Sequence, residues 1–111
     1  MTATKTVTIT RRSRMGFSWT NTPEQRRGDN GKSYLEIKAP SSEPSFVGTP
    51  KQTLAEFREA ARVNKGNFWG CRFFVLIDGD YRMIDAGRDE VVRELDWLCD
   101  GESDAIELPI A

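Results

Sequence analysis

The sequence contains no histidine among its 111 residues. This absence removes the usual general base at neutral pH, every Ser–His or Cys–His nucleophile pair and most catalytic zinc sites. A mechanism built on lysine or carboxylate groups needs no histidine, but no spacing in the chain singles out such a group. We therefore predict that the protein is not an enzyme and that it requires no cofactor.

Cysteine and long apolar runs are also scarce. Only Cys71 and Cys99 are present, fewer than a disulfide scaffold of this length carries. The longest apolar run, Phe73 to Ile77, has the length of a strand and falls far short of the ~20 residues of a transmembrane helix. No apolar stretch follows the first residues, so we expect no secretory signal. These features favour a cytoplasmic protein with two reduced core thiols, and a Cys71–Cys99 bridge is the alternative.

The composition fits one globular domain over residues 1–111. The chain is 38% hydrophobic and 30% charged, which is the balance of a folded domain rather than of a disordered one. A chain of this length buries enough surface to form a hydrophobic core without a metal or a disulfide. Membrane attachment is not expected.

Alternating patterns predict strands in the first part of the chain. Residues 4–10 alternate threonine with Lys5, Val7 and Ile9, as in a half-buried strand. Met15, Phe17 and Trp19 continue this period, so we expect a hairpin between the two stretches. A short strand is predicted over residues 34–38. The stretches 21–33 and 40–48 are rich in proline, glycine and polar residues and are predicted to be loops.

The second part of the chain alternates helices with strands. Thr49, Pro50 and Gln52 form a helix start with a capping box, and Gly66 is expected to end that helix. Its apolar stripe is Leu54, Phe57, Ala61 and Ala60. A second helix is predicted over residues 88–99, with Gly101 after its end.

Two strands and a tail are predicted around these helices. The continuous apolar segment 71–77 indicates a central strand covered on both faces. Asp78-Gly79 is a two-residue hairpin turn that leads into residues 80–85. This turn also explains Asp78 and Asp80, so we predict no metal site there. Residues 105–111 alternate again and are expected to close the sheet of their own chain or to pair with a neighbouring chain, which would make a homo-oligomer.

These elements predict an α+β fold with two layers. A mostly antiparallel sheet of about five strands would carry two helices on one face. The spacing between strands is too short for repeated βαβ units.

Charge is distributed unevenly along the chain. Residues 1–74 hold 13 Lys/Arg and 6 Asp/Glu, whereas residues 75–111 hold 3 Arg and 11 Asp/Glu. Such asymmetry indicates a charged partner. Alternatively, the two parts fold against each other and neutralise their charges.

The acidic third of the chain provides the first candidate site. A contact surface for a basic protein is predicted at Asp89, Glu90, Asp96 and Trp97. Alternatively, the acidic residues form the solvated outer face of the helix. Trp97 falls between the apolar stripe of the second helix and its acidic face, so it is a candidate interface anchor; in the alternative interpretation it belongs to the core. Asp100 and Glu102 follow the helix and oppose its dipole, a local cost that favours a functional surface.

The basic N-terminal part provides the second candidate site. Arginine binds phosphate groups in a bidentate manner, and aromatic rings stack on bases. The residues of this type are Arg11, Arg12, Arg14, Trp19, Arg26 and Arg27, with Phe17 between them. In the alternative interpretation the arginines are solvated while Phe17 and Trp19 lie in the core.

The sequence therefore predicts a non-enzymatic binding protein of the inhibitor or adaptor type. It would dock on another macromolecule, most directly a protein with a basic surface, and modulate it. The alternative is a binder of nucleic acid or of a phosphorylated, nucleotide-like ligand through the N-terminal arginines.

Overall fold

The computed structural model describes residues 5–21, 24–27, 33–36, 43–63 and 68–111, with the backbone alone for 20–21, 24–27, 33–36 and 68–69. Two helices lie in this part of the chain, α1 (Pro50–Val63) and α2 (Arg88–Cys99). The strands described are β1 (Lys5–Thr10), β2 (Met15–Asn21), β3 (Glu24–Arg27), β4 (Ser33–Glu36), β5 (Phe46–Gly48), β6 (Phe68–Ile77), β7 (Asp80–Met83) and β8 (Ala105–Ile110).

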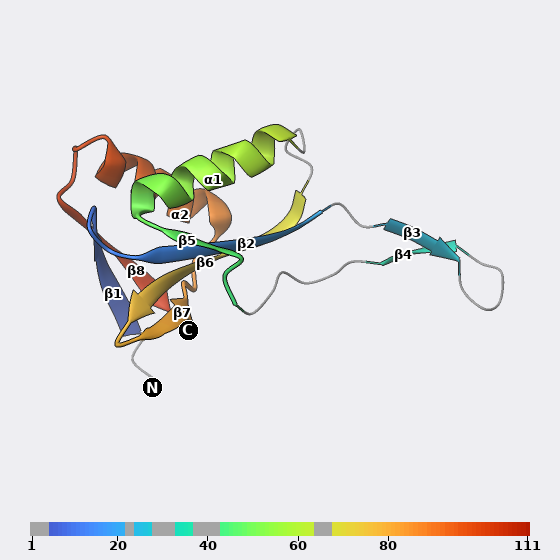
Figure 1. The fold of residues 1–111 in the computed structure, drawn as a ribbon, viewed down its shortest axis with the longest axis horizontal. Helices are drawn as coiled ribbons and strands as arrows, with labels where there is room; N and C mark the ends of the chain where they lie inside the picture. The colour runs from blue at the N-terminus through green and yellow to red at the C-terminus, as the bar shows by residue number, and fades with distance from the viewer. Residues whose placement is uncertain (1–4, 22–23, 28–32, 37–42, 64–67) are drawn as a thin grey trace.

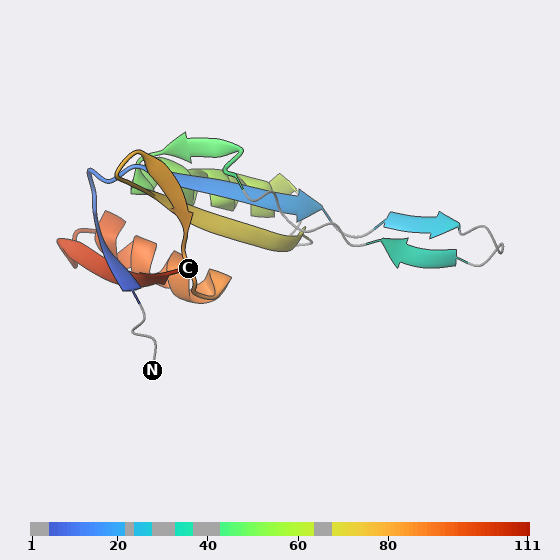
Figure 2. The same ribbon diagram turned by 90° about the horizontal axis from the view of Figure 1, so that it is seen from below.

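The strands form antiparallel sheets, and the predicted α+β fold is confirmed. The central sheet has four strands in the order β5-β2-β6-β7, while β1 pairs with β8 and β3 pairs with β4. The β3–β4 hairpin lies apart from the helices and the central sheet (Figures 1 and 2). Within the described residues, no helix is long and apolar enough to cross a membrane.

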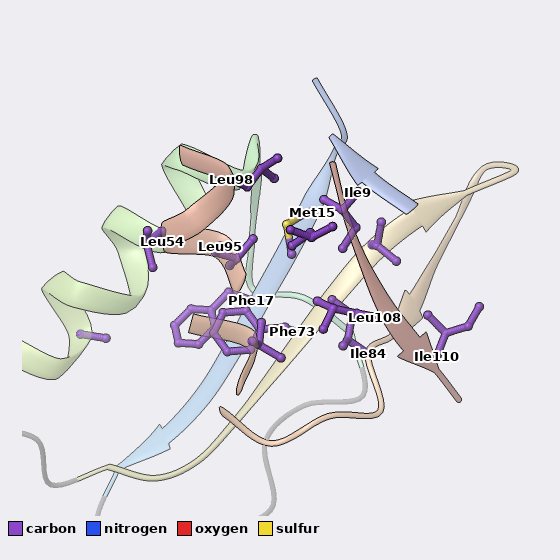
Figure 3. Close-up of a cluster of buried hydrophobic side chains, with 14 residues drawn as sticks. Ile9, Met15, Phe17, Leu54, Phe73, Ile84, Leu95, Leu98, Leu108 and Ile110 are labelled. Carbon is purple, nitrogen blue, oxygen red and sulfur yellow. The ribbon is translucent and has the colours of Figure 1, made fainter. Parts of the chain in front are cut away.

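One hydrophobic core joins the central sheet, both helices and the β1–β8 pair. Its centre is Phe17 of β2, whose side chain is fully buried and packs beside that of Phe73 (Figure 3). The ring of Phe57 contacts both of them, with centroids 6.0 Å from that of Phe17 and 5.9 Å from that of Phe73. Leu54 of α1 and Leu95 of α2 reach the same cluster, so both helices cover one face of the central sheet. The remaining buried members of the cluster are Ile9, Met15, Ala60, Val75, Ile84, Val91, Leu98, Ile106, Leu108 and Ile110.

The predicted hairpin between β1 and β2 is wrong, because β1 pairs with β8 and β2 with β5 and β6. The chain turns immediately after β1, where the Ser13 N–H donates to the Thr10 carbonyl oxygen at 3.0 Å. This turn sends β2 into a different sheet rather than back along β1. Ile9 and Met15 are thereby both fully buried, from two layers of the same core.

The predicted loops were also assigned too broadly. Residues 24–27 of the first one pair in strand β3 with β4, and residues 46–48 of the second one form β5 at the edge of the central sheet. These short stretches lack an alternating pattern, and their strand conformation comes from the neighbouring strand that pairs with them. Gly66, the predicted end of α1, lies outside the described residues, and the described helix runs to Val63.

The start of α1 and the end of α2 agree with the sequence. At the start of α1, the Gln52 N–H donates to Thr49 Oγ1 at 3.2 Å and the Thr49 N–H donates to Gln52 Oε1 at 2.9 Å, as a capping box requires. At the end of α2, Gly101 adopts a φ of 79°. There the Gly101 and Glu102 amides donate to the carbonyls of Leu98 and Trp97, the pattern of a Schellman motif.

The Asp78-Gly79 turn between β6 and β7 also has the predicted geometry. Both residues have positive φ, 50° and 87° respectively, which is the signature of a type I′ turn.

The tail forms β8, whose register with β1 places Leu108 opposite Val7 within the same chain.

Candidate protein-binding surface on helix α2

Helix α2 has a buried face and an exposed face with different chemistry. Val91, Leu95 and Leu98 are fully buried and hold the helix on the core. Trp97 lies outside this stripe and 48% of its surface is exposed. The alternative prediction that Trp97 belongs to the core is therefore wrong, because the helical period turns positions 91, 95 and 98 inward and position 97 away.

An open groove of about 720 Å³ runs between α1 and α2 beside Trp97. Two half-buried apolar side chains, Phe57 from α1 and Val92 from α2, contribute to its lining. The other lining residues are charged or aromatic: Arg58, Asp89, Arg93, Asp96, Trp97, Asp100 and Glu102. Apolar side chains beside an indole, with four carboxylates against two arginines, suit a partner segment that carries both apolar and basic groups.

The carboxylates predicted for this surface lie in different surroundings. Asp96 forms an ion pair with Arg58 that connects α2 to α1. The Asp89 side chain is 97% exposed and lies 3.6 Å from Arg88 Nε. Glu90 is exposed in the first turn of α2 but does not line the groove. The structure thus brings Asp89, Asp96 and Trp97 together, with Asp96 also holding the two helices.

Arg11 interacts with the C-terminal end of α2. Its Nη1 donates to the carbonyl oxygens of Leu98 at 3.1 Å and Ser103 at 2.9 Å, and its Nη2 contacts Asp104 Oδ1 at 3.1 Å. A cation at this end complements the helix dipole, and no basic residue of α2 itself lies in its last turn. Arg11, in the β1–β2 turn, therefore offsets the unfavourable interaction of Asp100 and Glu102 with the helix dipole. This local cost no longer supports a functional surface.

Replacing Arg11 should destabilise the fold. We expect Arg11→Met to lower the free energy of unfolding by about 1 kcal/mol, since charge-assisted hydrogen bonds to two backbone carbonyls are lost from a half-exposed side chain. Urea denaturation measures this change. Arg12→Met is the matched control, because Arg12 is exposed in the same turn. Equal effects of the two substitutions would contradict this role for Arg11.

The other residues predicted to bind nucleic acid or phosphate do not gather on one surface. Arg12 and Arg14 are exposed at the β1–β2 turn, whereas Trp19 is half-buried and packs against the core. Arg26 and Arg27 belong to β3, at the opposite end of the molecule from that turn (Figure 1). Since Arg11 is bound to α2, the set is divided between two distant places.

The two thiols are poor nucleophiles at neutral pH. Burial raises the pKa of Cys71 to about 11, and burial together with the carboxylates of Asp96 and Asp100 raises the pKa of Cys99. Both cysteines are free thiols in the structure, so the alternative prediction of a Cys71–Cys99 disulfide is wrong. Protonated thiols contribute packing rather than covalent chemistry.

Sequence reasoning missed the contribution of α1 to this surface. Phe57 was assigned to the apolar stripe of its helix, and Arg58 was not considered. Both line the groove because α1 packs beside α2, which a pattern within one helix does not reveal. The surface that results combines apolar side chains with four carboxylates and two arginines. No family model, no curated protein and no solved structure matches this chain.

Proposed function

We propose that this chain is a non-enzymatic binding protein that docks on a basic surface of another protein through α2 and modulates it, as inhibitors and adaptors do. The observation that carries the proposal is the exposure of Trp97 beside the α1–α2 groove. Among the described residues, the large hydrophobic side chains with comparable exposure are Val47 and Val63. Neither of these lines the groove.

The chemistry of the groove supports a basic protein as the partner. Tryptophan anchors ringed by polar groups carry much of the free energy of protein interfaces. Asp89, Asp100 and Glu102 are exposed in the lining of the groove that contains Trp97. They would attract a cationic partner over the range of the Debye length. In this proposal Glu90 adds charge outside the groove, and Asp96 positions the two helices. The protein would work in the cytoplasm, where its free thiols remain reduced.

Substitution of Trp97 should separate binding from folding. The indole is half-exposed and lies outside the core, so Trp97→Ala should change the free energy of unfolding by less than about 1 kcal/mol. Binding should weaken by about 2 kcal/mol, which is roughly thirtyfold, if the indole is an interface hot spot. Val63→Ala is the control, because it removes exposed apolar surface outside the groove.

The partner is first captured from native lysate at low salt after nuclease treatment, and its affinity is then measured by calorimetry. Charge reversal at Asp89 should mainly slow association and reduce its dependence on salt. Asp80→Lys makes the same change of charge at an exposed site outside the groove and should leave association unchanged. Capture that is lost on nuclease treatment, or a partner whose affinity is the same for Trp97→Ala and Asp89→Lys as for the native chain, would refute the proposal.

A further inference from the structure

The outer edge of β1 has no role in the proposed function and pairs with no described strand. β1 pairs with β8 along one edge, and no strand in the described part of the chain pairs with the other. The strand lies at the end of the molecule away from the β3–β4 hairpin (Figure 1). Apart from Lys5 at its start, β1 has no charged residue, and it contains no proline. Natural edge strands commonly carry charged residues or proline, which prevent pairing with another chain.

The hydrogen bonds of β8 show which groups of β1 face this edge. The N–H and C=O of one residue in an antiparallel strand point to the same side. The Pro109 carbonyl accepts from the Asp85 N–H at 2.8 Å, so it faces away from β1. Thr6 lies opposite Pro109, and its N–H and C=O therefore face away from β8. By alternation, the same holds for Thr8 and Thr10.

The free part of this edge is short and has a definite end. The Thr10 N–H donates to Ser13 Oγ at 2.9 Å, and the Thr10 carbonyl accepts from the Ser13 N–H at 3.0 Å. These bonds occupy the groups of Thr10 within the chain. Thr6 and Thr8 are exposed, and their backbone groups have no partner among the described residues. The free edge is therefore centred on Val7, which lies between them.

We propose that two copies of this chain pair through β1 as a symmetric antiparallel dimer. Thr6 of each copy lies opposite the partner's Thr8, and the two-fold axis passes through the Val7 pair. In this register the outward N–H and C=O groups of both threonines are satisfied in both copies. The Thr6–Thr8 contacts form on the exposed face of the sheet, where threonine pairs are favourable. The two half-buried Val7 side chains meet on the opposite face.

A second copy fits this edge because the edge is self-complementary. The donors and acceptors of Thr6 and Thr8 are arranged symmetrically about Val7, whose own position pairs with Leu108 of β8. Two such edges match without any further residue, and the dimer has one continuous antiparallel sheet made of both β1–β8 pairs. The interface is small, so we expect weak association that depends on concentration.

Sedimentation equilibrium of the native chain up to about 1 mM tests the proposal, since small interfaces associate weakly. We expect a reversible monomer–dimer equilibrium. Thr8→Pro removes an outward N–H from an edge position where proline is tolerated, and it should raise the dissociation constant of the dimer by about thirtyfold or more, because each of two equivalent hydrogen bonds is lost. Thr8→Ser retains this N–H and should leave the dissociation constant unchanged.

Cross-linking tests the register and does not depend on whether Thr8→Pro folds. In a chain with Cys71→Ala and Cys99→Ala, we expect Val7→Cys to form an intermolecular disulfide with oxidised glutathione. Facing residues of a non-hydrogen-bonded pair have Cα atoms ~4.5 Å apart, within the range that a disulfide spans. Thr8→Cys in the same background should not cross-link, because the two Thr8 positions are offset along the strands.

Three results would overturn the proposal. The first is a native chain that stays monomeric at every concentration, which would leave the edge to a strand of a different protein. The second is a dimer whose dissociation constant is unchanged by Thr8→Pro in a folded chain. The third is cross-linking at position 8 in preference to position 7.

Discussion

Truncation after Gly101 should abolish folding. The deleted segment contains β8, which contributes Ile106, Leu108 and Ile110 to the core at 5%, 1% and 9% exposure. Loss of one such side chain costs about 2–5 kcal/mol, and the stability of a whole domain is about 5–15 kcal/mol. Deletion also removes the only described strand that pairs with β1. Far-UV circular dichroism and urea denaturation of the truncated chain measure the result.

A point substitution provides a graded form of this test. Leu108→Ala should lower the free energy of unfolding by about 2–5 kcal/mol while the chain still folds. Glu107→Ala is the control, because its side chain is exposed on the other face of the same strand, and its effect should stay within about 0.5 kcal/mol. A truncated chain that melts like the native one would show that β8 is dispensable.

Phe17→Ala should give the largest loss of stability among single substitutions on the central sheet. Phe17 is fully buried, and its ring centroid lies 5.1 Å from that of Phe73 and 6.0 Å from that of Phe57. Removal of the Phe17 ring leaves a cavity where two helices meet the sheet. We expect this cavity to lower the free energy of unfolding by about 3–5 kcal/mol. Part of this cost is the edge-to-face contact with Phe57, at an interplanar angle of 79°.

Phe57→Ala is the matched comparison for Phe17→Ala. It removes a ring from the same cluster, but Phe57 is half-buried and borders the α1–α2 groove. The loss should therefore be clearly smaller than for Phe17, as measured by urea denaturation under the same conditions. A Phe57→Ala variant less stable than Phe17→Ala would place the centre of the core on α1 instead of on β2.

Local patterns predicted the elements that carry their own signals. The bounds of α2, the capping box of α1 and the Asp78-Gly79 turn are set by residues close together in sequence. Helix periodicity and turn chemistry act over a few residues, so they can be read without the fold. The short strands β3 and β5 lack such a signal, because their conformation depends on pairing with another strand, which for β5 is the distant strand β2.

The candidate surface was predicted only in part, for the same reason. The acidic residues of α2 and the position of Trp97 outside the apolar stripe follow from the helical period. Phe57, Arg58 and the Arg58–Asp96 ion pair depend on how α1 packs against α2. The arginine set illustrates the opposite case, since residues grouped by type in the sequence are separated between the β1–β2 turn and β3.

The sequence by itself determined the α+β class, both helices and the acidic character of α2, because these depend on composition and short-range periodicity. The tertiary structure decided that β1 pairs with β8, that Arg11 neutralises the C-terminal end of α2, and that a groove lies beside Trp97. Each of these contacts joins residues far apart in the chain. Many strand partners satisfy the same alternating pattern, and only the packing of one common core selects between them.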